Sequence, residues 1–424
     1  MQIEKDRKEE IGIDGKIQKP IIRKKSSALV VDILDNLELF FNNEKDPIEF
    51  LTLLDENLTR LQKQQILQLH RGFNFQRFVE KISEFQNQDI LLLGLKILSF
   101  LCQYSSSNRN SIFNEEFANF INNIFHSDSQ QAGIYCISII SDMIFYNFNL
   151  YQYFADGLLE KILTIPPTES SVYTIILIVS NFQEHVNEIL PLLDYFVKSD
   201  DELALNQLMS LLSYLYTEIE STEIQERVLL FFLQNFNHLI SSRTRFIMSA
   251  ALKFLIDVET SKIILPNDFF QLIIRMLQEI DPNKANADQE YSSFIILVAR
   301  FLYHMVPVWK GQYDEIICNE MKRFYGKLGF NCTKSTFRCF IAYFHFELWF
   351  NEEIYEDIIK YCESAPIAYV CFKSVLSAYG EAPSDSLFEL IQDLIPLAET
   401  HVDDENQTYS SAAEMFINEA TQLE

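Results

Sequence analysis

One pattern occurs three times between Arg71 and Phe182, and it constrains the fold more than any other feature. In each copy a small or polar residue precedes an apolar helix, a polar break follows, and a second apolar helix closes the copy. The copies are Gly72–Ile82 leading to Gly94–Cys102, Glu116–Phe125 leading to Gly133–Phe145, and Asp156–Leu163 leading to Val172–Phe182. Helix starts recur at about 40 residues, which is typical of helical repeats. Because such a repeat buries its apolar face only against its neighbours, the pattern predicts an all-α solenoid.

The composition supports a large helical core. Of the 424 residues 48% are hydrophobic, and 36 Phe and 19 Tyr supply bulky side chains for contacts between stacked helices. Only 10 Gly and 11 Pro occur, which disfavours a β fold rich in turns. No Gly-rich or Pro-rich linker divides the chain after Ala28. We therefore predict one repeat domain over residues 29–424, containing about eight or nine repeats.

Several helices can be placed in detail. Leu29–Phe41 has apolar residues at helical spacing and is expected to be the first amphipathic helix. Asp46-Pro47 predicts the next helix start, because Asp is a favoured N-cap and Pro fits the first helical position. In the second copy an apolar stripe is expected to pack against the neighbouring helices; it consists of Cys136, Ile140, Met143 and Ile144.

The net charge of −26 is unevenly distributed. Residues 1–28 hold 8 Lys and Arg against 5 Asp and Glu, a charge of +3, which leaves −29 for the remainder. This first segment contains Gly12, Gly15 and Pro20 and has no sustained apolar stripe, so we predict a disordered basic tail. The acidic body would repel phosphate backbones and anionic membrane surfaces. It favours a protein partner with a basic extended segment and argues against direct nucleic acid binding.

The sequence shows no local signature of catalysis, metal binding or a cofactor. Neither the glycine spacing of a dinucleotide-binding loop nor that of a Walker loop occurs. The seven Cys are scattered without a Cys-x-x-Cys pair and have apolar neighbours, so we expect buried, reduced thiols without zinc. Scattered, reduced cysteines and the lack of a visible signal peptide favour a cytoplasmic or nuclear protein. No apolar run approaches the roughly 20 residues of a membrane span. We expect a non-enzymatic protein without membrane insertion, small-molecule substrate or cofactor.

Short motifs within the copies resemble the armadillo repeat family. Asn108-Arg109-Asn110 before Ile112 is similar to the signature of the family's first helix, and Asp156-Gly157-Leu158-Leu159 to that of its second. The third-helix signature is matched by Leu98–Leu101, Ile140–Met143 and Val179–Phe182. The resemblance is clear over about 110 residues and implies a right-handed superhelical solenoid of armadillo or HEAT type. It also implies a concave groove lined by the third helices.

The nuclear-import adaptors of this family, the importin-alpha group, carry a Trp and, four residues later, an Asn on these third helices. There the Asn bonds the backbone of a cargo peptide and the Trp rings hold Lys and Arg stems. The matching Asn positions here are Phe100, Asp142, Asn181, Tyr214, Phe254 and Phe301, and the matching Trp positions are Lys96, Ser138, Leu177, Ser210, Ala250 and Leu297. Only Asn181 is retained. The resemblance therefore implies a groove without that clamp, and its candidate residues are Ser138, Asp142, Asn181 and Tyr214.

Several functional hypotheses remain open. The first is a protein-binding scaffold or adaptor that holds a partner segment in the concave groove. The second is a divergent nuclear-import adaptor, in which the basic residues Arg23, Lys24 and Lys25 would lie in the acidic groove or bind a transport receptor. The third is a structural subunit of a larger assembly. An enzyme within the solenoid would require a pocket with converging polar groups.

Overall fold

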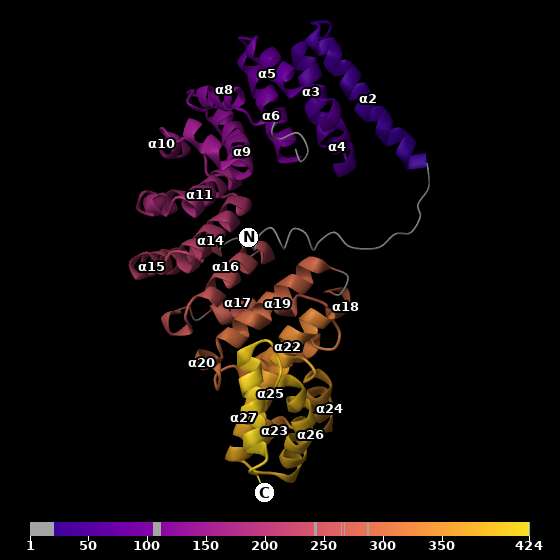
Figure 1. The fold of residues 1–424 in the computed structure, drawn as a ribbon, viewed down its shortest axis with the longest axis vertical. Coiled ribbons are helices and arrows are strands. Elements are labelled where there is room, and N and C mark those ends of the chain that lie inside the picture. The colour runs from indigo at the N-terminus through magenta and orange to yellow at the C-terminus, as the bar shows by residue number, and fades with distance from the viewer. Residues whose placement is uncertain are drawn as a thin grey trace. The chain divides into compact units, whose positions relative to one another are not determined.

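The regular elements of the chain are all helices. The computed structural model describes residues 21–104, 112–240, 244–263, 265, 266, 268–285 and 288–423, except for the side chains of residues 21–28 and 261, and no strand occurs among them (Figure 1). The prediction of an all-α fold is confirmed. None of the described helices is both long and apolar enough to cross a bilayer. The motif Asn108-Arg109-Asn110 and residues 1–20 of the expected tail lie outside the described residues.

The contacts between residues divide the chain into two compact units. Unit 1 is Met1–Ser199 and unit 2 is Asp200–Glu424. The boundary falls in the polar sequence Ser199-Asp200-Asp201, between two helices. The sequence analysis placed a single repeat domain over residues 29–424, and this continuity stays a prediction.

Unit 1 contains the three sequence copies, each as a short helix followed by a longer one. Its helices are α2 (Ile21–Phe41), α3 (Pro47–Leu58), α4 (Lys63–Gly72), α5 (Phe75–Ser83), α6 (Gln88–Tyr104), α8 (Glu115–Phe125), α9 (Gln130–Tyr146), α10 (Leu158–Ile162), α11 (Glu169–Asn181), α12 (Val186–Ile189) and α13 (Leu193–Phe196), with 3-10 turns at Phe148–Tyr153, Gln183–His185 and Leu190–Leu192. The long helices α3, α6, α9 and α11 contact one another in this order. They form the inner row of unit 1.

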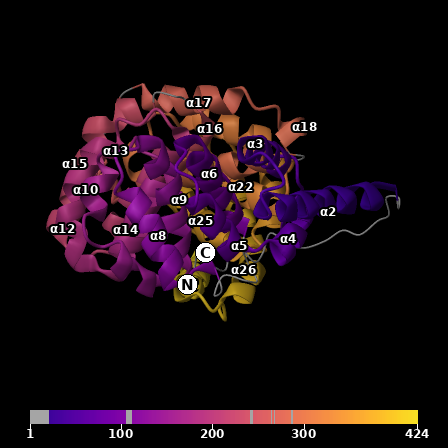
Figure 2. The same ribbon diagram turned by 90° about the horizontal axis from the view of Figure 1, so that it is seen from above.

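Helix α2 begins earlier than the sequence suggested. Its backbone is helical from Ile21, directly after Pro20, whereas the analysis began the helix at Leu29 and included residues up to 28 in the tail. No Gly or Pro follows Pro20 until Pro47, so nothing in this stretch breaks a helix. Figures 1 and 2 show the first turns of α2 extending beyond α3 and α4.

The helix starts of unit 1 follow the expected capping chemistry. Asp46 is the N-cap of α3, its carboxylate accepts a hydrogen bond from Glu49 N at 2.9 Å, and Pro47 occupies the first helical position, as predicted. Thr168 caps α11 through a reciprocal pair of bonds with Ser171. Each such cap satisfies a backbone N–H that the helix leaves unpaired and contributes about 1 kcal/mol.

Two glycines within the long helices α6 and α9 allow neighbouring helices to approach closely. A Cβ atom at Gly133 would lie 2.6 Å from Cγ2 of Ile165, and one at Gly94 would lie 3.0 Å from two carbons of Ile82. Ile82 and Ile165 are buried. A small residue is thus a packing requirement at these two positions. The expected stripe of α9 is buried as well, since Cys136, Ile140, Met143 and Ile144 expose at most 1% of their surface.

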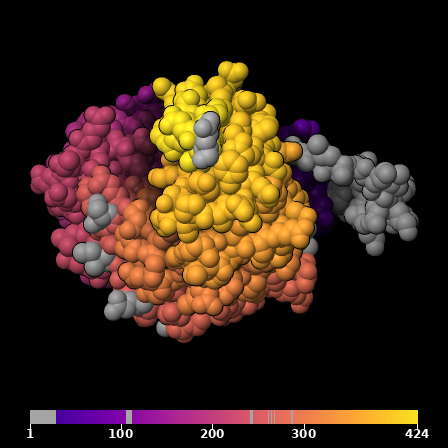
Figure 3. Space-filling model, turned by 90° about the horizontal axis from the view of Figure 1, so that it is seen from below, coloured from indigo at the N-terminus to yellow at the C-terminus, as the bar shows by residue number. Residues whose placement is uncertain are grey.

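Unit 2 continues the pairing of helices. Its helices are α14 (Glu202–Thr217), α15 (Thr222–Leu239), α16 (Arg245–Asp257), α17 (Phe269–Gln278), α18 (Pro282–Ala285), α19 (Gln289–His304), α20 (Val306–Trp309), α21 (Asp314–Phe324), α22 (Phe330–Tyr343), α23 (Phe346–Trp349), α24 (Glu352–Tyr361), α25 (Ala365–Glu381), α26 (Asp385–His401) and α27 (Gln407–Ala420), with a 3-10 turn at Thr260–Lys262. In the space-filling view of Figure 3 the C-terminal residues of unit 2, in yellow, pack against one another without a gap between them.

Buried aromatic rings connect four helices of unit 2, α15, α16, α17 and α19. Phe254 of α16 lies 4.6 Å from Phe232 of α15 between ring centroids, and Phe269 of α17 lies 4.8 Å from Phe236 and 5.9 Å from Phe301 of α19. All five rings are almost completely buried. Each ring buries a large apolar area, and edge-to-face pairs add about 0.5–1.5 kcal/mol each.

Candidate binding groove

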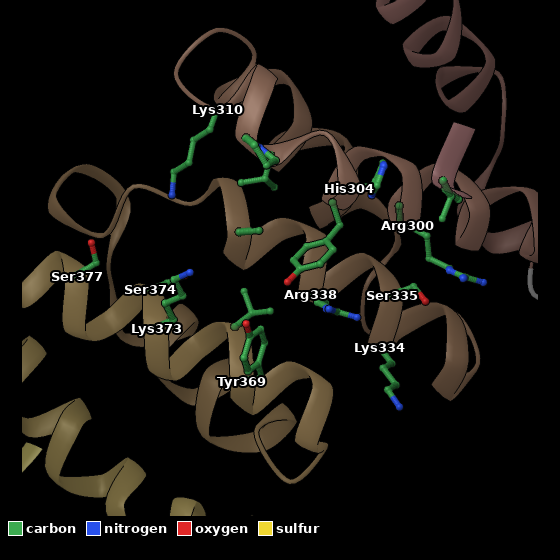
Figure 4. A pocket seen from close by; sticks show the side chains of 17 residues that line it. Arg300, His304, Lys310, Lys334, Ser335, Arg338, Tyr369, Lys373, Ser374 and Ser377 are labelled. Carbon is green, nitrogen blue, oxygen red and sulfur yellow. The ribbon is translucent and has the colours of Figure 1, made fainter. Parts of the chain in front are cut away.

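Five long helices of unit 2 form an inner row, whose exposed side is the candidate site. Contacts join α14 to α16, α16 to α19, α19 to α22 and α22 to α25. On the exposed side of the last three lies an open hollow of about 640 Å³ (Figure 4). We call this hollow the cationic groove. It is lined by 17 residues: Ile256, Ala299, Arg300, Tyr303, His304, Val306, Pro307, Lys310, Lys334, Ser335, Arg338, Ala342, Tyr369, Val370, Lys373, Ser374 and Ser377.

The charges of the cationic groove have one sign. Five of its lining residues are Lys or Arg, and none of the 17 is Asp or Glu. The helical period explains the arrangement, because residues four apart share a face. On α22 Lys334 precedes Arg338 by four, and on α25 Tyr369 precedes Lys373 by four. Arg300, Arg338 and Lys373 thus reach the groove from three successive inner helices (Figure 4).

Arg338 is held in place without a carboxylate. Its guanidinium carbon lies 4.0 Å from the ring centroid of Tyr303 on α19, a cation–π contact. Its Nε is buried and has no hydrogen-bond partner among the described residues. Among the described residues, no carboxylate oxygen lies within 4.0 Å of the charged nitrogens of the five groove cations. Outside the cationic groove, Lys96, Arg245 and Arg323 do form ion pairs with carboxylates. Unpaired cations near one another retain their capacity to bind an anion.

A second set of contacts positions Lys310 at one end of the groove. The following residue, Gly311, adopts φ 88°, a left-handed conformation that favours glycine. Its N–H donates to Oδ1 of Asp314 at 2.8 Å, and the other oxygen of that carboxylate bonds Nε2 of His345 after α22. The loop that carries Lys310 is thereby tied to the end of α22.

His345 in this network titrates unusually. Burial lowers its pKa, but the hydrogen bonds that the ring donates to Glu347, 2.9 Å from Nδ1, and to Asp314 raise it more, so the pKa of His345 is raised overall. The charged imidazolium is the form that both carboxylates stabilise.

Two smaller hollows continue the line of the cationic groove along the inner row. One of about 420 Å³ lies over α14, α16 and α19, shares Ile256 and Arg300 with the cationic groove, and includes Lys253. The other, of about 340 Å³, lies over α16 and α19, shares Lys253 with the first, and is also lined by Arg245, Phe246 and the carboxylate residue Glu290. Neighbouring hollows that share lining residues therefore follow one another on the exposed side of the inner row from α14 to α25.

Asp257 is the acidic residue of the middle hollow. Burial raises its pKa, and the charges of Arg300 and His304 act in the opposite direction. His304 also donates from Nε2 to the carbonyl oxygen of Val258 at 2.7 Å. This bond fixes the ring at the edge of the groove rather than leaving it as a mobile base.

The residues proposed from sequence lie in both units. Ser138 and Asp142 are half-buried, one turn apart on α9 of unit 1, and share a face as expected. Asn181 is exposed at the end of α11, but its side-chain amide donates to Leu177 O at 2.8 Å, so part of its hydrogen-bonding capacity serves its own helix. Tyr214 is half-buried on α14 of unit 2. The side chains of Arg23, Lys24 and Lys25 lie outside the described residues.

The transferred family motif placed some groove residues correctly and missed others by one position. The matching Trp positions that line the middle hollow are Ser210, Ala250 and Leu297. The motif also placed Phe254 and Phe301 on the groove side, yet both rings are fully buried. The preceding residues, Lys253 and Arg300, line the hollows instead. One residue of helix corresponds to a rotation of about 100°, which moves a side chain from the groove into the core. The sequence contained a signal for this, because a large aromatic residue such as Phe254 or Phe301 favours the core side of an amphipathic helix.

The cysteines do not contribute to the groove. All seven are buried, as predicted, and burial raises the thiol pKa of Cys332 to about 12. Among the described residues no group of three or more His, Cys, Asp or Glu side chains is arranged to hold a metal ion.

Comparisons with known proteins address the fold alone. No protein family model matches the chain, and no curated protein matches it. The chain is similar to the crystal structure of an engineered protein from the Northeast Structural Genomics Consortium, with a TM-score of 0.52 at 9% identity. The similarity covers 93% of this chain and 99% of the engineered protein. At this identity it supports the helical architecture and carries no functional information.

Proposed function

We propose that the chain is a non-enzymatic, armadillo-like scaffold that binds an extended segment of a partner protein along the inner row of unit 2. In this proposal the helices stack as a right-handed solenoid of about eight or nine repeats, and the inner row lines its concave face. The observation that supports the proposal is the line of hollows that continues from α14 to α25.

The dimensions of the inner row suit an extended chain. Packed helices are about 8–10 Å apart, so four steps from α14 to α25 span about 35 Å. An extended segment rises about 3.3 Å per residue, and about 11 residues would cover this length. A small molecule would contact only part of such a surface.

The chemistry of the groove favours binding over catalysis. Its polar groups are distributed along three helices, and His304 is engaged with Val258 O. The unpaired cations also weigh against a basic import signal as the occupant of unit 2, since like charges across an interface are unfavourable. The hypothesis of an import adaptor therefore gains no support from this face.

A selection experiment tests the proposed function. A library of random linear peptides would be enriched on the full chain, and the affinities of enriched peptides would be measured for the wild type, Ser374→Trp and Asn331→Trp. Ser374 lines the cationic groove, whereas Asn331 is exposed at the start of α22 and lines none of the hollows described above. We expect Ser374→Trp to weaken binding by about tenfold or more, because the indole fills the hollow, and Asn331→Trp to leave it unchanged. Equal binding by both variants, or no enriched peptide at all, would remove the proposal.

A further inference from the structure

The charge of the cationic groove opposes that of its surroundings. Unit 2 contains 16 Lys and Arg against 34 Asp and Glu, a net charge of −18, whereas unit 1 has −8. The more acidic unit thus carries a groove lined by five cations and no carboxylate. On an acidic surface, cations grouped without ion-pair partners create a local field that attracts anions.

The cations are spaced along the inner row rather than gathered at one point. Lys253, Arg300, Arg338 and Lys373 belong to α16, α19, α22 and α25, four successive inner helices. Helices about 8–10 Å apart place successive cations about three residues apart along an extended chain. A series of separate carboxylates matches this spacing better than a single phosphate group, which binds best where several cations converge.

Apolar side chains line the groove together with the cations. Val306 and Pro307 of α20, Val370 of α25 and Ile256 of α16 line the groove, so an occupant gains by burying an apolar side chain there. A long nucleic acid gains little from these contacts. Its phosphates would also extend beyond the groove over a unit with a net charge of −18, which repels them.

We propose that the cationic groove binds an extended acidic peptide segment, with Asp or Glu at about every third residue and an apolar side chain between them. This inference rests on the proposed function of the groove and specifies its partner. The proposed partner segment is acidic, whereas the net charge of the chain suggests a basic partner. Arg300, Arg338 and Lys373 contact the carboxylates from three successive helices, and Arg338 is held for this role by its contact with Tyr303.

Fluorescence anisotropy with the full chain tests the inference. The probe is a labelled 12-residue peptide with Asp at every third position and a central Leu. The comparison ligands are the same peptide with Lys in place of Asp, and a single-stranded oligonucleotide of equal length. We expect the acidic peptide to bind at least about tenfold more tightly than the basic one, and its affinity to fall as salt is raised.

Charge reversal locates the binding. In Arg300→Glu with Arg338→Glu the acidic peptide should bind at least about tenfold more weakly, because each lost charge-assisted contact is replaced by repulsion. Arg275→Glu is the matched control, since Arg275 is exposed on α17 and lines none of these hollows, and its effect should stay within about twofold. If the double variant melts earlier than the wild type, Arg300→Gln with Arg338→Gln preserves more of the packing and should still weaken binding.

The outcomes separate the inference from the proposed function. Equal or tighter binding of the basic peptide, lost in Ser374→Trp, would overturn the acidic partner and leave the peptide-binding groove intact. Tighter binding of the oligonucleotide that depends on Arg300 and Arg338 would identify a nucleic acid interface instead. Failure of all three ligands to bind, together with a failed peptide selection, would overturn both proposals.

Discussion

Gly133, in the first turn of α9, gives the sharpest test of the packing in unit 1. In Gly133→Ala the new methyl group would lie 2.6 Å from Cγ2 of Ile165, which is itself buried. Overpacking of this kind costs about 1–3 kcal/mol, while replacing a helical glycine by alanine returns about 0.5–1 kcal/mol. We therefore expect a net loss of about 1–2 kcal/mol in the free energy of unfolding.

A matched substitution shows whether crowding is the cause. Gly380 is also helical, in α25, but no atom lies within 4 Å of the Cβ position there. Gly380→Ala should therefore leave the free energy of unfolding unchanged or raise it by up to about 1 kcal/mol. In the background Ile165→Leu, which lacks the branched Cγ2 methyl group, the cost of Gly133→Ala should shrink, because the two side chains are coupled.

Urea denaturation followed by circular dichroism measures these changes. With a slope of about 2 kcal/mol/M, Gly133→Ala should lower the transition midpoint by about 0.5–1 M. A midpoint equal to or above that of the wild type would refute the reasoning. An unchanged cost in the Ile165→Leu background would show that Ile165 is not the side chain that is displaced.

Three further changes follow from the structure. The pKa of His345 is raised, so its stabilising contribution is fully present below the unfolded pKa of about 6.5 and is lost as pH rises through the higher folded pKa. The difference in urea midpoint between the wild type and His345→Gln should therefore be larger at pH 6 than at pH 8.5. An equal difference at both pH values would contradict the Asp314–His345 contact. All seven cysteines are buried, and burial raises the thiol pKa of Cys136, Cys318, Cys332, Cys339 and Cys371, to about 12 for Cys332; we expect slow labelling by a thiol reagent in the native protein and complete labelling in urea, and fast native labelling would contradict this. Removing the N-cap oxygen in Thr168→Ala should cost about 1 kcal/mol, whereas Thr421→Ala after α27 should cost less, which urea titration compares directly.

The fold class was predictable because its signals are local and repeated. The cap at Asp46 and the apolar stripe of α9 each follow from residue type and spacing within one or two helices. The start of α2 was placed too late, because a charged stretch that includes Arg23, Lys24 and Lys25 resembles a tail in composition while containing no residue that ends a helix.

The groove was less predictable because it depends on rotation about each helix axis. A family motif transferred onto Phe254 and Phe301 was in error by one residue, and one residue exchanges the groove side for the core. The basic partner expected from the net charge differs from the acidic partner proposed for the groove. A net charge of −26 averages over the whole surface and conceals the local cations Arg300, Arg338 and Lys373. Only the packing of α19, α22 and α25 brings these three together.

Site-directed photo-cross-linking tests the central claim most directly. A benzophenone amino acid would replace Ser374 in the cationic groove or, as a control, Arg275 on the outer helix α17, and each protein would be irradiated with the same bound peptide. The account predicts a covalent adduct from position 374 and none from position 275. An adduct from position 275 alone, or no adduct from position 374 at peptide concentrations that saturate binding, would show that the peptide binds elsewhere and would contradict the groove as the binding site.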